Sequence, residues 1–491
     1  MTATPIRILL DTNVLIAAES DEEPRHPRAA DAAELLSLAA RLGHTVCLAS
    51  TVRDDLARHA DEAHRQRRHW QLQRYHVLEP ITVPPGFRER AGYPPNVGPN
   101  GLVDMTLLLA LERSAAQWLV TEDQPLHGHA RQLDLADRTF SIADAIDVLR
   151  RQVESPLLIP AVQEIKGFQL DVDDPIFDDF DPAYKVKEWV RAKVAPEHRP
   201  CLVIGEPGQL DSLVILNHER EQPWSLPAPT LKVCTFKVAE AARGVKRGEL
   251  LLWAIFQHAR RNRYESIFVE VFAHEQALIA MLESFGFVDL AVSTSRDDER
   301  VYAKRLRPTP GADVLDPLAH NIAHGPGTLR PQRIFLIPIV PHWHASLFPV
   351  ADEQLSLMPG LTDHGNAIRK AYLCHSPSRQ LEPGDVLLFY RTHQDQQVRA
   401  VGVVEQTLVS SDPARILEFT GRRTVYTPVE VDRMCRKGQV LAIRFRLDRV
   451  LDTPLDMDKL TDHAVMRRSP QSIMRVQDPG ATQWLQGLLA G

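Results

Sequence analysis

Two apolar segments in the N-terminal third of the chain are followed directly by polar and acidic residues. The segment Ile6–Leu10 precedes Asp11, and Trp118–Val120 precedes Thr121 and, two residues later, Asp123. An amphipathic helical pattern and a second apolar strand lie between them. Strands that alternate with helices predict a parallel α/β sheet, in which the carboxyl ends of the strands share one edge. We therefore expect acidic side chains along one edge of a sheet within residues 1–155.

Two further acids are placed to reach the same edge. Asp55 lies in the helix that follows the predicted strand Thr45–Ala49, and Asp104 lies near the start of the predicted helix 101–116. Carboxylates that converge repel one another and are costly to bury without compensation. Mg²⁺ or Mn²⁺ prefers oxygen ligands and lowers the pKa of a bound water, which can then attack phosphorus. The pattern predicts a metal site for phosphodiester cleavage.

The motifs around these acids point to a family. The strings LLDTNVLI, STVRDDL, GLVDMTLLLAL and LVTEDQPL resemble the four successive motifs of PIN-domain ribonucleases over about residues 5–150. The resemblance implies four catalytic acids and two supporting polar residues: Asp11, Asp55, Asp104, Asp123, Asn13 and Thr121. It also implies that Asp11, Asp104 and Asp123 bind the metal ion and that Asp55 positions or activates water.

The second and fourth acids each have a neighbour that keeps the assignment open. The family usually has Glu at the second position, whereas this chain has Asp55 with Asp54 beside it. Glu122 likewise adjoins Asp123. A shorter side chain at the second acidic position would shift the metal ion or weaken its binding.

The middle segment, 156–307, contains a basic turn between a strand, Leu231–Val238, and a helix, Glu249–Arg261. A helix N-terminus with basic residues binds phosphate well. The segment 160–307 resembles a GNAT acyltransferase, with an α+β mixed sheet, and His274 stands where Asn is common. Arg243 and Gly248 match the family's pyrophosphate-binding turn, but Lys246 replaces its middle glycine. The acetyl-CoA residues that this resemblance implies are Arg243, Gly244, Val245, Lys246, Arg247 and Gly248.

No motif marks a general base for acyl transfer. Glu240, His258 and Tyr302 are the three candidates, and each also has a structural interpretation. The resemblance therefore predicts acetyl-CoA binding more directly than it predicts which residue removes a proton.

A Pro-, Gly- and Ala-rich segment, 308–330, reads as a linker, and residues 331–491 follow it as a third domain. Short strands, one entered through Pro-Gly-Asp, predict a small β-barrel. The segment LEPGDVLLFYRTHQDQQVRAVGVVEQ is similar to the PUA-like superfamily, which includes ASCH and EVE domains and implies binding of RNA or a modified nucleotide. Polar, basic and aromatic residues of the kind that contact bases and phosphates are Arg369, Lys370, Tyr390, Arg391, Arg422, Arg423, Tyr426 and Gln471.

Composition narrows the class of protein. The net charge of -7 argues against indiscriminate nucleic-acid binding and favours a local basic patch. The five cysteines are odd in number and none has CxxC spacing, so neither a zinc ribbon nor a disulfide framework is expected. No membrane-spanning run and no signal peptide is evident, and a cytoplasmic location is the default. The fold class we expect is multidomain α/β.

Three functions are compatible with these patterns. The first is a metal-dependent PIN-type ribonuclease, toxin-like or RNA-processing, whose substrate is RNA such as tRNA, with an inhibitor protein and a homodimer as partners that the family suggests. The second is an N-acetyltransferase that uses acetyl-CoA on an RNA base, an aminoacyl-tRNA amine or a protein amine. The third is an RNA-binding scaffold in which both enzyme folds are inactive. Metal-dependent cleavage separates the first from the second.

Overall fold

The computed structural model describes residues 6–18, 26–52, 75–153, 162–178, 180, 185–206, 208–219, 221, 223–239, 247–293, 299–311, 314–349, 368–393 and 396–489. The chain divides into two units, Met1–Ser155 with Leu408–Ala442, and Pro156–Thr407 with Ile443–Gly491. Within the described residues, no helix is both long and apolar enough to cross a membrane.

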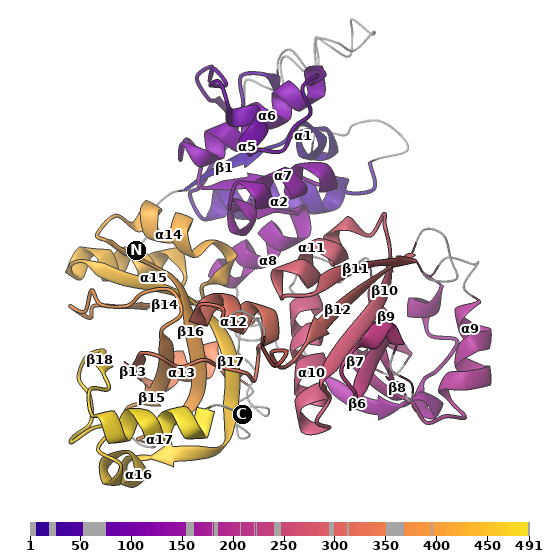
Figure 1. The fold of residues 1–491 in the computed structure, drawn as a ribbon. Coiled ribbons are helices and arrows are strands. Elements are labelled where there is room, and N and C mark those ends of the chain that lie inside the picture. Colours follow the sequence, from indigo (N-terminus) through magenta and orange to yellow (C-terminus); the bar gives the residue numbers. More distant parts are fainter. Residues whose placement is uncertain are drawn as a thin grey trace, which may run out of the picture. The chain divides into compact units, whose positions relative to one another are not determined.

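The first unit is built on a parallel sheet with the order β3-β2-β1-β4-β5, and Figure 1 shows its strand β1 among the helices of the unit. Its strands are short and almost fully apolar, as expected for parallel strands buried on both faces. The strands are β1 (Arg7–Leu10), β2 (Thr45–Leu48), β3 (His76–Val77), β4 (Trp118–Val120) and β5 (Thr139–Phe140). The helices are α1 (Thr12–Ala18), α2 (Ala29–Arg41), α5 (Phe87–Arg90), α6 (Pro99–Glu112), α7 (Gln124–Gln132) and α8 (Ile142–Val153).

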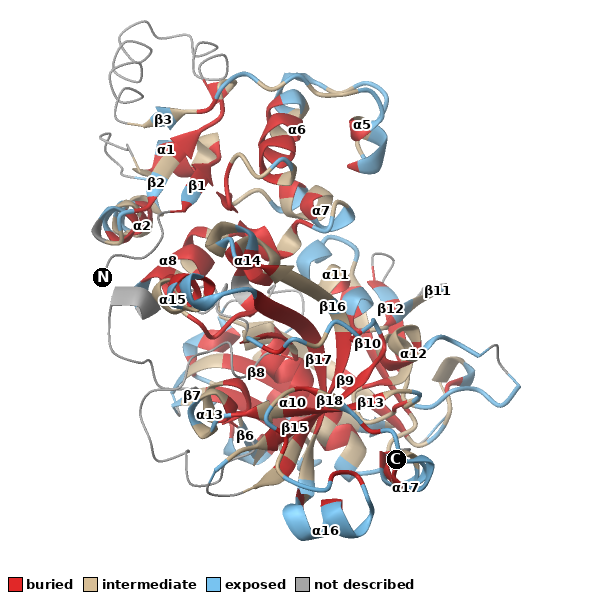
Figure 2. Cartoon of the chain, turned by 90° about the vertical axis from the view of Figure 1, so that its left-hand side faces the viewer, coloured by how far each residue is buried: buried red, intermediate tan, exposed pale blue. Residues whose placement is uncertain are grey.

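Helix α6 carries most of the core of this unit. Residues 105–111 of α6 are all buried, and Figure 2 shows the helix largely in the colour of buried residues. A helix that is apolar on nearly all sides must be covered on all sides. Asp104 is therefore held on a rigid element close to the carboxyl edge of the sheet.

An insertion from the C-terminal part of the chain belongs to the first unit. It contains α14 (Pro413–Thr420) and α15 (Pro428–Lys437). Arg423 forms a buried ion pair with Asp137 at 2.8 Å, and Glu418 binds Arg138 at 2.7 Å and the Ser114 hydroxyl at 2.6 Å. Because these partners precede β4 or β5, the insertion packs at the amino-terminal edge of the sheet, opposite the acidic edge.

The second unit begins with a mixed sheet of order β11-β12-β10-β9-β8-β7-β6, in which only β9 and β10 are parallel. The strands are β6 (Gln163–Lys166), β7 (Pro200–Glu206), β8 (Gln209–Glu219), β9 (Thr230–Val238), β10 (Ser266–Phe272), β11 (Val288–Ser293) and β12 (Glu299–Arg305). The helices are α9 (Val186–Trp189), continued by a π-helical turn Val190–Val194, α10 (Arg247–Arg261) and α11 (Gln276–Ser284).

A third sheet has the linear order β14-β17-β16-β15-β13-β18. The predicted β-rich module is thus a mixed sheet, and β14 and β18 are its edge strands within the described residues. The strands are β13 (Ile334–Ile339), β14 (Arg369–Cys374), β15 (Val386–Arg391), β16 (Gln397–Ser410), β17 (Val440–Asp456) and β18 (Met474–Arg475). The helices are α13 (Pro341–Leu347), α16 (Met457–Asp462) and α17 (Pro479–Leu489).

The predicted linker 308–330 differs from a simple connection, because it contains helix α12 (Pro317–His324). Asp316 caps this helix by accepting hydrogen bonds from the backbone of its first turn, and Pro317 occupies the first helical position, where it fits well. The buried Lys304 ammonium donates to the carbonyl oxygens of Ile322 and Ala323 at 2.8 and 2.9 Å. The segment is therefore anchored to the middle sheet.

Candidate functional sites

Asp11 lies at the carboxyl edge of the first sheet and is almost completely buried. Its carboxylate accepts hydrogen bonds from the Thr12 backbone N–H at 2.6 Å, the Asn13 side-chain amide at 2.7 Å and the Thr121 hydroxyl at 2.6 Å. Leu10 and Val120 pair in adjacent parallel strands, so the residues after them meet at this edge. Asn13 and Thr121 thus both donate hydrogen bonds to Asp11.

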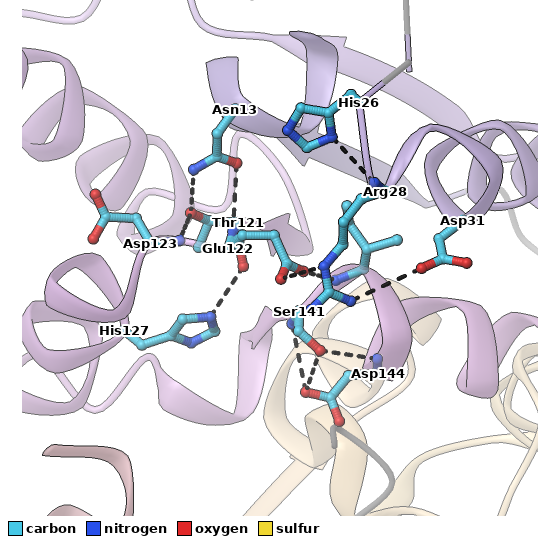
Figure 3. A network of polar contacts seen from close by, with 11 residues as sticks. Asn13, His26, Arg28, Asp31, Thr121, Glu122, Asp123, His127, Ser141 and Asp144 are labelled. Carbon is cyan, nitrogen blue, oxygen red and sulfur yellow. Dashed lines mark hydrogen bonds and ion pairs between the residues drawn. The ribbon is translucent and has the colours of Figure 1, made fainter. Parts of the chain in front are cut away.

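The two neighbouring acids at the fourth position have different partners (Figure 3). Asp123 caps α7, and its Oδ1 accepts a hydrogen bond from the Leu126 N–H at 3.2 Å. Glu122 instead binds Arg28 at 3.3 Å and accepts a hydrogen bond from the Ile142 N–H at 2.7 Å. Because Glu122 is already occupied by α2 and α8 partners, Asp123 is the better candidate for the acidic site.

Tyr93 shows that three of the predicted acids share one environment. Burial raises the pKa of its phenol, and the charges of Asp104, Asp123 and, more weakly, Asp11 raise it further. The Tyr93 ring stacks on His129 with centroids 3.7 Å apart. Sequence reasoning missed Tyr93 because it lies in the Pro- and Gly-rich segment 82–100, where no motif marks it.

In the part of the chain that the structure describes, the predicted acids do not form a complete metal site. Within the described residues, no three His, Cys, Asp or Glu side chains lie close enough together to hold a metal ion. The second predicted acid, Asp55, and its neighbour Asp54 lie outside the described residues. The complete four-acid set therefore remains a prediction.

The parallel strands β9 and β10 separate part of the way along their length. Their ladder joins Thr230–Val233 to Ser266–Val269, yet β9 continues to Val238 and β10 to Phe272. A β-bulge between β8 and β9 leaves Cys234 without a partner in β8, at the point where the ladder to β10 ends. A bulge bends its strand and increases its twist, which accounts for the separation. Beyond Val233 one edge of β9 has no strand beside it among the described residues.

Arg247 begins α10, the helix that follows β9. Its Nη2 lies 3.1 Å from Asp211 Oδ2, and its Nε and Nη1 are buried without a hydrogen-bond partner among the described residues. Buried N–H donors without acceptors are costly, so this guanidinium fits an anionic ligand. Gly248 is the next residue of the helix. The rest of the predicted turn, Arg243, Gly244, Val245 and Lys246, lies outside the described residues.

Two of the three candidate bases have structural surroundings, and the third, Glu240, lies outside the described residues. His258 is buried near the end of α10, about 16 Å along the helix from Arg247 at 1.5 Å per residue. Burial lowers its pKa, and its Nδ1 lies 3.3 Å from Glu164. Tyr302 is buried on β12, opposite Val269.

Glu270 is an acid at the strand separation that sequence reasoning missed. It follows Val269 on β10, directly after the ladder with β9 ends, and its Oε2 lies 2.7 Å from Lys232 Nζ. Both side chains are about one-quarter exposed. A single charged residue inside the apolar strand SIFVEVF was the available signal.

The residues predicted to contact RNA lie in varied surroundings. Lys370, Tyr390 and Tyr426 are buried, with exposed fractions of 1%, 0% and 3%. Tyr390 belongs to the hydrophobic core of the third sheet. Because an interior ring cannot stack on an RNA base without rearrangement, Tyr390 and Tyr426 do not provide surface platforms.

The charged members of that set are divided between both units. Arg369 Nε binds Glu405 at 2.8 Å, and Arg423 forms the buried pair described above. Arg391 is half-buried at the end of β15, Gln471 is exposed, and the side chain of Arg422 is not described. Of these residues, Arg391 and Gln471 therefore both keep part of their surface exposed.

Comparison with known proteins identifies one domain. The model of the acetyltransferase (GNAT) family matches residues 168–287. The chain therefore contains a GNAT acetyltransferase domain, and the predicted mixed sheet is its scaffold. No curated protein sequence matches the chain.

Solved structures resemble single parts of the chain. ASCH from Zymomonas mobilis is 14% identical and covers 32% of this chain and 94% of its own, with a TM-score of 0.24. An N-acetyltransferase from Staphylococcus aureus is 20% identical and covers 30% and 98%, with a TM-score of 0.25. The IAA acetyltransferase from Bacillus cereus is 14% identical and covers 30% and 98%, with a TM-score of 0.23. These scores are too low to carry an argument about function.

Proposed function

We propose that this protein is an acetyl-CoA-dependent N-acetyltransferase. The separation of β9 from β10 after Val233 and Val269, inside the domain matched by the GNAT family, is the observation that carries the proposal. A strand edge without a neighbouring strand offers backbone N–H and C=O groups to an extended ligand. The acceptor is an amine on an RNA base, an aminoacyl-tRNA or a protein.

The residues around the separation have complementary tasks in this proposal. Acetyl-CoA supplies the activated acetyl group when it is bound. The edge of β9 beyond Val233 holds the pantetheine arm by backbone hydrogen bonds, and Arg247 donates to a phosphate oxygen at the start of α10. Glu270 orients the acceptor amine and takes up the proton that the amine loses.

Arg247→Gln is expected to weaken acetyl-CoA binding by about 10- to 150-fold, because a hydrogen bond to a charged group contributes about 1.5–3 kcal/mol. Calorimetric titration with acetyl-CoA measures this loss. Glu270→Gln should keep the acetyl-CoA affinity of the wild type in the same titration. In a separate turnover assay with an amine acceptor, it should lower kcat. Equal acetyl-CoA affinity of the wild type and Arg247→Gln would contradict the assignment of this turn.

A second candidate function is metal-dependent RNA cleavage by the first unit. The observation that favours it is the common effect of Asp104, Asp123 and Asp11 on the Tyr93 phenol. Three carboxylates that act on one buried group repel one another, and Mg²⁺ or Mn²⁺ held by them would relieve that repulsion. Within this candidate function, Asp55 positions water, the C-terminal module presents the RNA, and an inhibitor protein or a second copy of the chain is a further partner.

Removal of divalent metal is expected to abolish cleavage of labelled cellular RNA that Mn²⁺ or Mg²⁺ supports. Asp11→Asn should abolish the same cleavage, since it replaces an ionised ligand by a neutral amide. Gel analysis of the RNA with Mn²⁺, Mg²⁺ or EDTA provides the measurement, and circular dichroism checks the fold of the variant. Cleavage that persists in EDTA, or in Asp11→Asn, would rule out this second function.

A further inference from the structure

His344 is a buried polar side chain in the C-terminal module without an evident structural role. It lies on α13, has an exposed fraction of 0%, and neither ring nitrogen has a hydrogen-bond partner within the described part of the chain. Leaving a buried donor or acceptor unsatisfied costs about 1–3 kcal/mol. A buried imidazole whose ring nitrogens lack partners is therefore expected to bind a ligand, because an apolar ring would otherwise be more stable at this position.

The sheet surface that contacts α13 is fixed by aromatic contacts. Phe348, four residues after His344, packs on Phe389 of β15 with ring centroids 4.8 Å apart, and on His344 itself at 5.1 Å. Figure 1 shows α13 beside β13 and β15. Leu388 and Tyr390 belong to the core on the opposite face. Side chains alternate along a strand, so Phe389 and Arg391 share the face that contacts α13.

A β-bulge brings a second arginine to this face. Phe389 pairs with Ala400 and Tyr390 pairs with Val398, which leaves Arg399 without a partner in β15. Val398 and Val401 both belong to the core on the opposite face. The two residues between them, Arg399 and Ala400, therefore both turn toward the α13 face, as is usual where a bulge inserts one residue.

The electrostatics agree with this arrangement. Burial, together with the nearby charges of Arg391 and Arg399, lowers the pKa of His344 to about 3. Both arginines are half-buried, and the Nε atom of each is buried. His344 is neutral at pH 7 and donates through one ring N–H.

We propose that His344, Arg391 and Arg399 bind a phosphate group, either as free phosphate or as part of a nucleotide. Guanidinium groups and an imidazole N–H are hydrogen-bond donors that suit a phosphate oxyanion. A phosphate would give the buried His344 N–H an acceptor. This site is separate from Arg247 and does not depend on acetyl transfer.

Calorimetric titration of the full chain with inorganic phosphate, AMP and adenosine tests the proposal. All proteins carry Arg247→Gln, which removes the phosphate contact proposed for acetyl-CoA. Arg391→Gln and Arg399→Gln are each expected to weaken phosphate or AMP binding about tenfold or more. His344→Phe, which keeps a ring but removes both nitrogens, is expected to weaken binding as well. Arg467→Gln, an exposed arginine of the same module, is the matched control and should bind like the parent.

The ligands distinguish the source of the phosphate group. Tighter binding of AMP than of phosphate, with no binding of adenosine, assigns the site to a nucleotide phosphate. Binding of phosphate at least as tight as AMP assigns it to the free anion. Binding of adenosine as tight as AMP would overturn the proposal. So would an absence of millimolar binding of phosphate and AMP, or equal affinity in Arg391→Gln, Arg399→Gln and Arg467→Gln.

Discussion

Glu405→Gln is expected to lower the free energy of unfolding of the second unit by about 3–5 kcal/mol, the range for breaking a buried ion pair. Glu405 accepts hydrogen bonds from Arg369 at 2.8 Å and from Arg446 at 3.0 Å, and its side chain is 12% exposed. Arg446 also donates to the Ser284 carbonyl at 3.2 Å, and the Arg369 N–H donates to Glu249 at 2.7 Å. The variant leaves two inward-facing guanidinium groups without their carboxylate.

The same cluster predicts a dependence on pH. Burial by itself would raise the pKa of Glu405, but the charges of Arg369 and Arg446 hold it below the ordinary value of 4.5. A group with a lowered folded pKa stabilises the fold above its unfolded pKa, and this contribution is lost as the pH falls through the folded value. The wild type should therefore lose this stabilisation below about pH 4.5, and Glu405→Gln should lack that part of the acid response.

Urea unfolding followed by hydrogen exchange in β14, β16 and β17 measures the effect. Asp289→Asn is the matched control. Asp289 also forms an ion pair with an arginine, Arg300, at 2.7 Å, but the Arg300 side chain is 59% exposed. Exposed pairs contribute about 0–1 kcal/mol. Equal effects of the two variants would show that the Glu405 cluster does not stabilise the second unit as a buried ionic group.

Gly286→Ala is expected to destabilise the second unit by about 2–5 kcal/mol, through backbone strain and overpacking together. Gly286 has φ +80°, and a Cβ there would lie 2.0 Å from the Ile322 carbonyl oxygen. It ends α11, and the next residue, Phe287, donates its N–H back to the Leu282 carbonyl at 3.1 Å. An added methyl group would force α12 away from α11 and from the Lys304 ammonium.

The control for this variant is Gly311→Ala. Gly311 has φ +79°, and a Cβ there meets nothing within 4 Å. It therefore carries the cost of the left-handed backbone, about 1–2 kcal/mol, without the collision. Thermal and urea unfolding of both variants separate the two contributions, and equal destabilisation would mean that contact with α12 contributes nothing.

Part of the order of the helices and strands could be read from the sequence. The apolar runs around Leu10, Val120 and Val386 became strands, because parallel and central strands are buried on both faces and keep few polar positions. The GNAT domain was likewise predicted from its strand, basic turn and helix. Helix α12 was missed because its Asp316 cap and Pro317 start lie in a segment whose composition is typical of a linker.

Tertiary structure alone decided which polar residues can meet a ligand. Arg369, Arg423 and Tyr390 carry the side chains that nucleic-acid sites use, yet Arg369 and Arg423 form ion pairs and Tyr390 is interior. Asp137, the partner of Arg423, lies 286 residues away in the sequence, and Glu405, the partner of Arg369, lies 36 residues away, so no local pattern reveals them. The bulges at Cys234 and Arg399 are also set by pairing with another strand.

The sequence by itself determined that acids follow strands of a parallel sheet and that a basic turn precedes a helix in the GNAT domain. Both features are local, because the apolar pattern of a strand or helix follows the period of its backbone. Only the fold decided that Asp11, Asp104 and Asp123 share the environment of Tyr93. Only the fold placed Glu270 at the separation of β9 from β10, and Arg391 and Arg399 close enough to His344 to lower its pKa. Burial and strand register join residues distant in the chain, and these long-range contacts have no signature in a single sequence.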